Sequence, residues 1–293
     1  MTISAKAATQ EHPELLDVKK KSTIRLAQDG DVDAQFDLAF SYLDQKEFEK
    51  AIEWWEKAAQ QGNIPAHTNL AIMYEDGLGV EKDDVKAAKL YRVAAKSGNA
   101  IAQTNLGELY DGKGIGISLD YKEAAKWYTL AANQGMVTAQ LNLGYLYYFG
   151  NGVNRNYVEA ARWFKDASDQ GLPQAQFLLG TMYKEGTGFP VNLPESVRWY
   201  KSASAQGNVD AQINLAMAYA SGWGVEINKR KAFELFMRVS DKEHERQGVV
   251  QANLGIYYYN GKGVGADKVE AHKWFSLSSH NGHNESKTYA ESI

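Results

Sequence analysis

One pattern recurs seven times along this chain, and it limits the possible folds more than any other feature of the sequence. Each copy opens with a small residue, usually followed by Gln, and has Leu four residues on, Gly or Ala five on and Tyr eight on. Successive copies are separated by 32, 36, 37, 36, 36 and 39 residues, and their opening residues are Ala34, Ala66, Ala102, Ala139, Ala175, Ala211 and Val250. Repeats of this length are typical of solenoids, in which each unit packs only on its neighbours. The 293 residues therefore need no single large core.

Each copy predicts a pair of helices. In the fourth copy, Leu143, Gly144 and Tyr147 share one helix face, and the small residue in this stripe lets another helix approach closely. Glycines follow, as expected at a helix C-terminus where the backbone takes positive φ. A second helix then begins after an Asp or Asn that can cap its N-terminus, and these predicted caps are Asp83, Asp120, Asn156, Asn192, Asn228 and Asp267.

The fourth copy carries a resemblance to a known family. It reads Ala139-Gln140-Leu141-Asn142-Leu143-Gly144-Tyr145-Leu146-Tyr147, then Gly150-Asn151-Gly152-Val153, then Ala160-Ala161-Arg162-Trp163-Phe164 and Ala167-Ser168-Asp169-Gln170-Gly171. This succession resembles the Sel-one-like repeat (SLR) family, relatives of the tetratricopeptide repeats (TPR), and the resemblance covers about residues 23–283. It implies an all-α fold: a right-handed α/α superhelical solenoid of about seven Sel-one-like, TPR-like helix-turn-helix repeats with terminal capping helices.

The repeats divide the chain into four segments. We expect a disordered N-terminus over residues 1–13, an N-terminal capping helix over 14–30, the seven-repeat domain over 31–283, and a C-terminal cap or tail over 284–293. The stretch Asp241–Val249 is three residues longer than its equivalents and lacks their Gln-Gly ending. It is expected to bend the stack or widen a gap.

Charge and composition exclude several classes of function. The formal net charge of −4, without a basic stripe, argues against binding of nucleic acid or of an anionic membrane. No stretch has the length of a transmembrane helix or the apolar core of a signal peptide, so we expect a cytoplasmic monomer, with export by a non-Sec route left open. The absence of cysteine removes disulfides and thiolate chemistry.

The sequence offers no recognisable catalytic or cofactor site. His280 and His283 have helix-face spacing, but no third ligand stands at partner spacing, so no metal is expected. The glycines between Gly112 and Gly116 resemble a phosphate loop only superficially, because such loops follow a strand and these follow a helix. We therefore predict no cofactor and no enzymatic activity.

The positions two, three, six, nine and ten residues after each opening residue point away from the packed stripe of the first helix. We call this set the first-helix face. The family resemblance implies that first helices line a concave groove in which partners lie. At the third position the sequence repeats an amide, and this ladder consists of Asn69, Asn105, Asn142, Asn214 and Asn253. It either binds a peptide backbone or forms hydrogen bonds that hold the helices together.

Other positions of the first-helix face change character along the chain. The first three copies carry acids, namely Asp37, Asp44, Glu75, Asp76, Glu108 and Asp111. The fourth and fifth copies carry aromatics, namely Tyr145, Tyr148, Phe149 and Phe177. Tyr148 and Phe149 either anchor a partner or pack against the next turn. Trp223, between two turn glycines, is either a loop anchor at the surface or a cover for its own loop.

These observations favour a non-catalytic scaffold or adaptor that binds a protein or peptide in the groove formed by its first helices. A partner with basic and apolar contact residues would complement the acids and aromatics. The resemblance implies bacterial adaptor or scaffold roles. Two alternatives remain open: a cytoplasmic immunity protein that neutralises a bacterial toxin, and a secreted effector that binds a host protein. An enzyme is the least favoured class.

Overall fold

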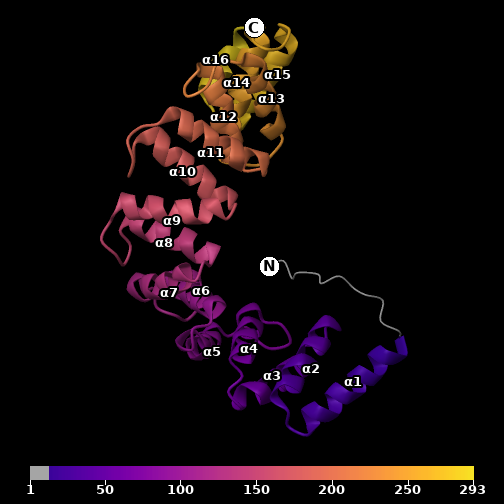
Figure 1. Cartoon of the computed structure of the whole chain (residues 1–293). Coiled ribbons are helices and arrows are strands. Elements are labelled where there is room, and N and C mark those ends of the chain that lie inside the picture. Colours follow the sequence, from indigo (N-terminus) through magenta and orange to yellow (C-terminus); the bar gives the residue numbers. More distant parts are fainter. Residues whose placement is uncertain (1–12) are drawn as a thin grey trace. The chain divides into compact units, whose positions relative to one another are not determined.

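The structure is a computed structural model that describes residues 13–293, with side chains described from residue 21 onward. Over this range it has sixteen α-helices, one π-helical turn and no strand, which confirms the predicted all-α solenoid class (Figure 1). The prediction for residues 1–13 lies outside the described residues, except that Pro13 begins the first helix.

The contacts divide the chain into two compact units. Unit 1 comprises residues 1–139 and 151–153, and unit 2 comprises residues 140–150 and 154–293. The helices of unit 1 are α1 (Pro13–Gln28), α2 (Val32–Asp44), α3 (Phe48–Gln60), α4 (Ile64–Asp76), α5 (Asp84–Lys96), α6 (Ala100–Glu108), the π-helical turn η1 (Leu109–Lys113) and α7 (Tyr121–Asn133). Each α-helix of this unit packs on the next one along the chain.

Unit 2 continues the same alternation of first and second helices. Its helices are α8 (Val137–Phe149, which begins in unit 1), α9 (Tyr157–Asp169), α10 (Pro173–Glu185), α11 (Leu193–Ala205), α12 (Val209–Ser221), α13 (Lys229–Val239), α14 (Gln247–Asn260), α15 (Lys268–His280) and α16 (Glu285–Glu291). From α9 to α16, each helix packs on the next. The helices α1 and α16 fall in the segments predicted as caps, and their capping role stays a prediction.

Hydrogen bonds from the predicted Asp and Asn caps start the second helices. Asp83 Oδ1 accepts from the Lys86 backbone N–H at 2.8 Å, and Asn192 Oδ1 accepts from that of Glu195 at 3.1 Å. The remaining predicted caps make equivalent bonds and are Asp120, Asn156, Asn228 and Asp267. These contacts satisfy backbone donors that the first helical turn leaves free, and they confirm the predicted helix starts.

In the four repeats whose first helix has glycine at the small-residue position, that glycine accommodates an aromatic ring from the second helix. A Cβ added at Gly144 would lie 2.5 Å from the Phe164 ring, and one added at Gly255 would lie 2.7 Å from the Phe275 ring. The rings are fully or almost fully buried. The two helices of a repeat therefore approach more closely than a larger residue would allow.

A second set of glycines lets one repeat seat against the previous one. Gly224 has φ +70°, and a Cβ there would overlap the backbone carbonyl of Leu193 at the start of α11. Gly188 meets Tyr157 at the start of α9 in the same way. These positions require glycine both for the backbone angle and for the space.

Comparing Gly224→Ala with Gly207→Ala should separate the requirement for a positive φ from the requirement for space. Both glycines have positive φ, but a Cβ at Gly207 meets nothing within 4 Å. Gly207→Ala should cost about 1 kcal/mol of unfolding free energy, the penalty for left-handed backbone. Gly224→Ala should cost about 2 kcal/mol more, because the turn must also move away from α11. Urea denaturation measures both, and equal costs would contradict the close approach.

Buried glutamines link successive repeats. Gln176 of α10 is 4% exposed, and its Nε2 donates to the Ser168 carbonyl of α9 at 3.3 Å. Its Oε1 accepts from Gln206 Nε2, at the end of α11, at 2.9 Å. One side chain thus joins the previous repeat to both helices of its own repeat, which explains the Gln that follows most opening residues.

We call the pair of hydrogen bonds made by Gln176 the glutamine relay. Gln212 makes only one of the two. Its Nε2 donates to the Ser204 carbonyl at 3.2 Å, but its buried Oε1 has no hydrogen-bond partner. The repeat that contains Gln212 ends in the long stretch Asp241–Val249 without Gln-Gly, so it supplies no glutamine at the corresponding place.

The two glutamines should respond differently to removal. Gln176→Ala breaks both hydrogen bonds and should lower the free energy of unfolding by about 1 to 3 kcal/mol. Gln212→Ala removes one bond together with an unsatisfied oxygen, so its cost should be smaller. Thermal and urea unfolding of both variants check the order, and a larger loss for Gln212→Ala would contradict the relay.

Candidate functional site

The predicted first-helix face is distributed over both units. All six acids belong to unit 1 and all four aromatics to unit 2, so each set is described within its own unit. The acids lie on α2, α4, α6 and η1, and the aromatics on α8 and α10.

Three of the six acids are open to solvent. Asp37 and Asp44 on α2 and Asp76 at the end of α4 are exposed. Glu75 differs, because it is 5% exposed and its Oε2 accepts a hydrogen bond from the Tyr91 hydroxyl at 2.7 Å. Glu75 is therefore a buried member of a polar network and not a free surface charge.

Lys113 completes this network. Its Nζ lies 2.7 Å from Glu75 Oε1 and 3.0 Å from Glu108 Oε2, so one lysine pairs with two predicted groove acids. Partial burial lowers the pKa of Lys113, but the hydrogen bonds to Glu75 and Glu108 outweigh this and raise it above its ordinary value. The acidic surface is consequently smaller than the sequence suggested.

The π-helical turn η1 brings Lys113 to this place. It replaces the usual end of a first helix, and Gly112 within it has φ 104°. The third repeat is also the one followed by a step of 37 residues. Asp111 in the same turn accepts from the Tyr128 hydroxyl at 3.2 Å, and burial raises the pKa of its carboxyl group. This acid too is engaged with its own repeat.

The asparagine ladder makes several different contacts. Asn105 Nδ2 donates to the hydroxyl of Tyr91 on the preceding helix at 2.9 Å. Asn253 Nδ2 donates to the Val249 carbonyl of its own helix at 2.8 Å. Asn69 and Asn142 are half-buried, and the buried Nδ2 of Asn69 has no partner. Asn105 and Asn253 thus have contacts inside the fold, while a ligand role for Asn69 and Asn142 stays a prediction.

A pairing visible in the sequence accompanies these contacts. Fourteen residues before four of the five ladder asparagines stands a second-helix aromatic, as in Tyr91 with Asn105 and Tyr200 with Asn214, and Asn253 is the exception. The Tyr91 hydroxyl accepts from Asn105 at 2.9 Å, whereas the Tyr200 hydroxyl lies 3.0 Å from Thr181 Oγ1. Where the aromatic is Phe164, which has no hydroxyl, the ladder residue is Leu178. The aromatic carries a hydroxyl before Asn105, Asn142 and Asn214, but before Asn69 it is a tryptophan, so the amide does not always accompany a hydroxyl.

The long connection after α13 covers part of the ladder. Arg246, from that connection, donates through Nη1 to Asn214 Oδ1 at 3.0 Å and contacts Met217 Sδ through Nη2 at 3.5 Å. Asn214 is 6% exposed. The inserted residues therefore close the first-helix face at α12, a role that their length alone did not reveal.

The aromatics of α8 form one cluster. Tyr145 stacks on Phe149 with ring centroids 6.2 Å apart, and Tyr148 meets Phe149 edge-on at 5.1 Å. Tyr148 also packs against Tyr157 at 5.2 Å, so this ring contacts the following helix. Phe149 itself remains 61% exposed. The cluster thus presents one open ring held by two partly buried rings.

Phe177 and Trp223 converge on the same tyrosine. Phe177 lies 5.9 Å and Trp223 6.1 Å from the Tyr200 ring. Both are partly buried beside the core of unit 2, and Lys184 Nζ lies 5.6 Å from the Trp223 ring. Trp223 therefore packs onto a core ring, and its role as a loop anchor stays a prediction.

Sequence reasoning missed an aromatic surface in unit 1. Phe40 on α2 is 38% exposed and packs edge-on against Phe36 at 5.0 Å and Trp55 at 5.3 Å. Phe36 and Phe40 lie two and six residues after the opening residue Ala34, so both belong to the first-helix face. The positions that define the first-helix face include both residues, but the prediction for this unit considered only its acids.

Other kinds of site receive no support from the part of the chain that the structure describes. Among the described side chains, those of residues 21–293, no group of three or more from His, Asp or Glu is placed to hold a metal ion. No helix in this range has both the length and the apolar character that a membrane span requires.

Two-helix repeats, ring-on-glycine packing and capped second helices define an α-solenoid of the tetratricopeptide-like class. The chain belongs to the Sel1 repeat family, whose model matches residues 32–63, 64–99, 100–136, 137–172, 173–208, 209–238 and 249–283. This confirms the family expected from the fourth copy.

Solved structures share the fold. A protective antigen of uropathogenic Escherichia coli with an SLR fold is 31% identical with a TM-score of 0.86, and the match covers 92% of this chain and 58% of that protein. This chain thus spans little more than half of that relative's length. A Sel1 repeat protein from Oxalobacter formigenes is 28% identical with a TM-score of 0.73, over 97% of this chain and 82% of its own. No protein of curated function matches the sequence.

Removing the Lys113 ammonium group tests the network around Glu75. Lys113→Met leaves the buried Glu75 carboxylate without its counter-charge, so the free energy of unfolding should fall by about 1 to 2 kcal/mol, allowing for the partial exposure of Lys113. Lys122→Met, at an exposed position of α7, should change it by less than about 0.5 kcal/mol. Urea unfolding of both variants decides, and an unchanged Lys113→Met protein would remove the network's structural role.

Proposed function

We propose that this chain is a non-catalytic scaffold that binds a protein or peptide through exposed side chains of its first-helix face. Sel1 repeats form a scaffold that is typical of protein–protein interaction. The structure adds which first-helix side chains are open and which are used in packing, and only the open ones enter the proposal.

The exposed ring of Phe149 carries this proposal. A large apolar side chain that is 61% exposed loses the benefit of burial unless something covers it. Tyr145 and Tyr148 hold the ring from two sides, so little side-chain freedom remains to be lost on binding. Rigid aromatic side chains of this kind are common anchors at protein interfaces.

Unit 1 offers a second part of the proposed surface. Exposed Phe40 lies on the same helix as the exposed acids Asp37 and Asp44. A partner segment with basic residues next to apolar ones would complement these side chains. Glu75, Glu108 and Asp111 make no part of this surface, because their carboxylates are already bonded within unit 1.

A photo-crosslinking residue tests the anchor in the cell. Benzoylphenylalanine at position 149 should capture a specific partner in cells of the source organism, whereas the same residue at position 158 should not. Val158 is the matched control because it is 62% exposed but lies on a second helix. Capture at both positions, or at neither, would count against the proposed surface.

The captured partner then allows a quantitative comparison. Phe149→Ser should weaken binding of the purified partner by about tenfold or more, as expected for loss of an aromatic anchor. Val158→Ser should leave the affinity within about twofold. Because both side chains are exposed, both variants should melt close to the wild type. Equal affinities for the two variants would overturn the proposal.

A further inference from the structure

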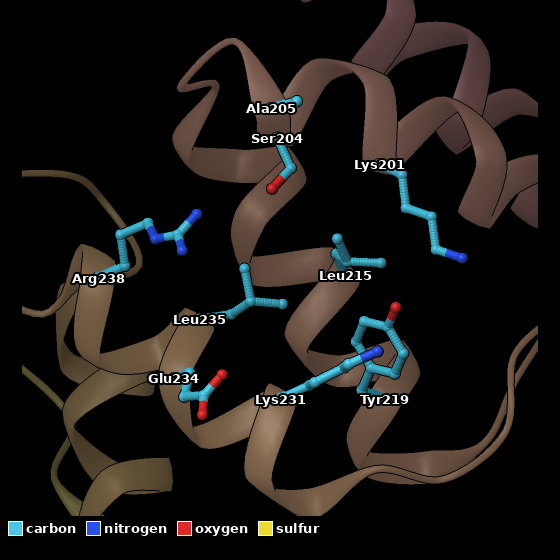
Figure 2. A pocket seen from close by; sticks show the side chains of 9 residues that line it. All are labelled: Lys201, Ser204, Ala205, Leu215, Tyr219, Lys231, Glu234, Leu235 and Arg238. Carbon is cyan, nitrogen blue, oxygen red and sulfur yellow. The ribbon is translucent and has the colours of Figure 1, made fainter.

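Unit 2 contains a cavity that lies outside the first-helix face. Its volume is about 280 Å³, and it is formed by α11, α12 and α13 (Figure 2). The side chains that matter most for its chemistry are Lys201, Leu215, Tyr219, Lys231, Leu235 and Arg238. Leu215 and Leu235, which are 5% and 8% exposed, supply an apolar floor.

Three cationic side chains surround this floor. Lys201 Nζ lies 5.9 Å and Lys231 Nζ 5.4 Å from the centre of the Tyr219 ring, so two ammonium groups share one aromatic side chain. Arg238 stands at another edge of the cavity (Figure 2). Within residues 21–293 none of the three makes an ion pair. The only acid in the lining, Glu234, is paired with Arg230 at 3.0 Å.

The equivalent cavity in unit 1 is lined by both an acidic and a basic side chain. It is lined by Glu56 from α3, Tyr74 from α4 and Lys86 from α5, which correspond in the repeat to Lys201, Tyr219 and Lys231. Glu56 Oε1 lies 3.5 Å from the Tyr74 hydroxyl, and Lys86 Nζ lies 3.9 Å from the Tyr74 ring. One acid and one base thus meet at this tyrosine, whereas two bases meet at Tyr219.

Lys231 occupies a position that is lysine in three of the seven second helices, the other two residues being Lys50 and Lys86. The position that it occupies holds glutamate in four second helices, and these residues are Glu123, Glu159, Glu195 and Glu270. A glutamate at position 231 would face Lys201 with the opposite charge. The sequence instead places two lysines beside the Tyr219 ring, and an anion between them would reduce their mutual repulsion.

We propose that this cavity binds an acidic peptide segment that carries a bulky apolar side chain beside its carboxylates. The carboxylates would lie between Lys201, Lys231 and Arg238, where charge-assisted hydrogen bonds are strong. The apolar side chain would cover Leu215 and Leu235. A volume of about 280 Å³ accommodates a side chain or two and falls below the range typical of sites for whole small-molecule ligands.

This surface does not depend on the first-helix face. Tyr219 occupies the eighth position of its repeat, on the packed stripe, and the remaining polar groups come from second helices. The two surfaces also call for different partners, because the exposed acids of unit 1 favour a basic segment. Variants at Phe149 leave this cavity intact, so the two proposals can fail separately.

Titration calorimetry with the full chain tests the proposal directly. The probe is a six-residue peptide, capped at both ends, with two leucines flanked on each side by two glutamates. At 50 mM NaCl we expect saturable binding to one site, and binding should weaken by about tenfold in 500 mM NaCl because exposed charges are screened. The same peptide with lysine in place of glutamate should not bind.

The variant Lys231→Glu locates the site. It installs the residue that four other repeats carry, so the protein should fold and its Tm should not fall below that of the wild type. Its affinity for the acidic peptide should drop at least tenfold. Lys122→Glu changes the net charge equally at an exposed position in unit 1 and should stay within about twofold of the wild type.

Three outcomes of the peptide titrations would overturn the proposal, and a fourth would come from inorganic phosphate. The first three are the absence of saturable peptide binding, equal affinity of wild type and Lys231→Glu, and equal losses in Lys231→Glu and Lys122→Glu, which would indicate a general charge effect. Inorganic phosphate serves as a further probe. If phosphate binds in competition with the peptide and as tightly, the cavity is a simple anion site and the apolar floor has no role.

Discussion

The contact between a second-helix ring and a small first-helix residue is the constraint on which this structure depends. At Gly107 a Cβ would lie 2.6 Å from the Tyr128 ring, and the same arrangement recurs at Gly144 with Phe164. Because each repeat closes around one buried ring, the faces that point away from the ring are free to vary. The polar networks and the two proposed binding surfaces occupy those faces.

Polar contacts make the repeats different from one another. The Gln176 relay joins neighbouring repeats in a regular way, and Gln212 shows the effect of a missing member. Lys113 and Arg246 act locally: each comes from an irregular connection and neutralises or covers polar side chains of a first helix. Irregular connections thus determine which part of a repetitive surface remains open.

The two proposed surfaces differ in the sign of their charge. Exposed Asp37 and Asp44 accompany Phe40 in unit 1, while Lys201 and Lys231 surround Tyr219 in unit 2. Both combine an aromatic ring with unbalanced charge, but the sign is opposite. A scaffold with two such surfaces can discriminate between basic and acidic segments, because like charges across an interface disfavour the wrong partner.

The sequence by itself determined the repeat, the helix pairs, the caps and the family, because each depends on local spacing: Leu143, Gly144 and Tyr147 lie on one helix face in any surroundings. It also assigned Phe149 to the first-helix face, since helix geometry gives direction, but it left open whether the ring packs against the next turn. Only the tertiary structure decided which polar residues are free. Glu75 and Asp76 are adjacent in the sequence, yet the first is buried against Tyr91 and Lys113 and the second is exposed. That difference depends on side chains 16 and 38 residues further along the chain, whose approach no local pattern encodes.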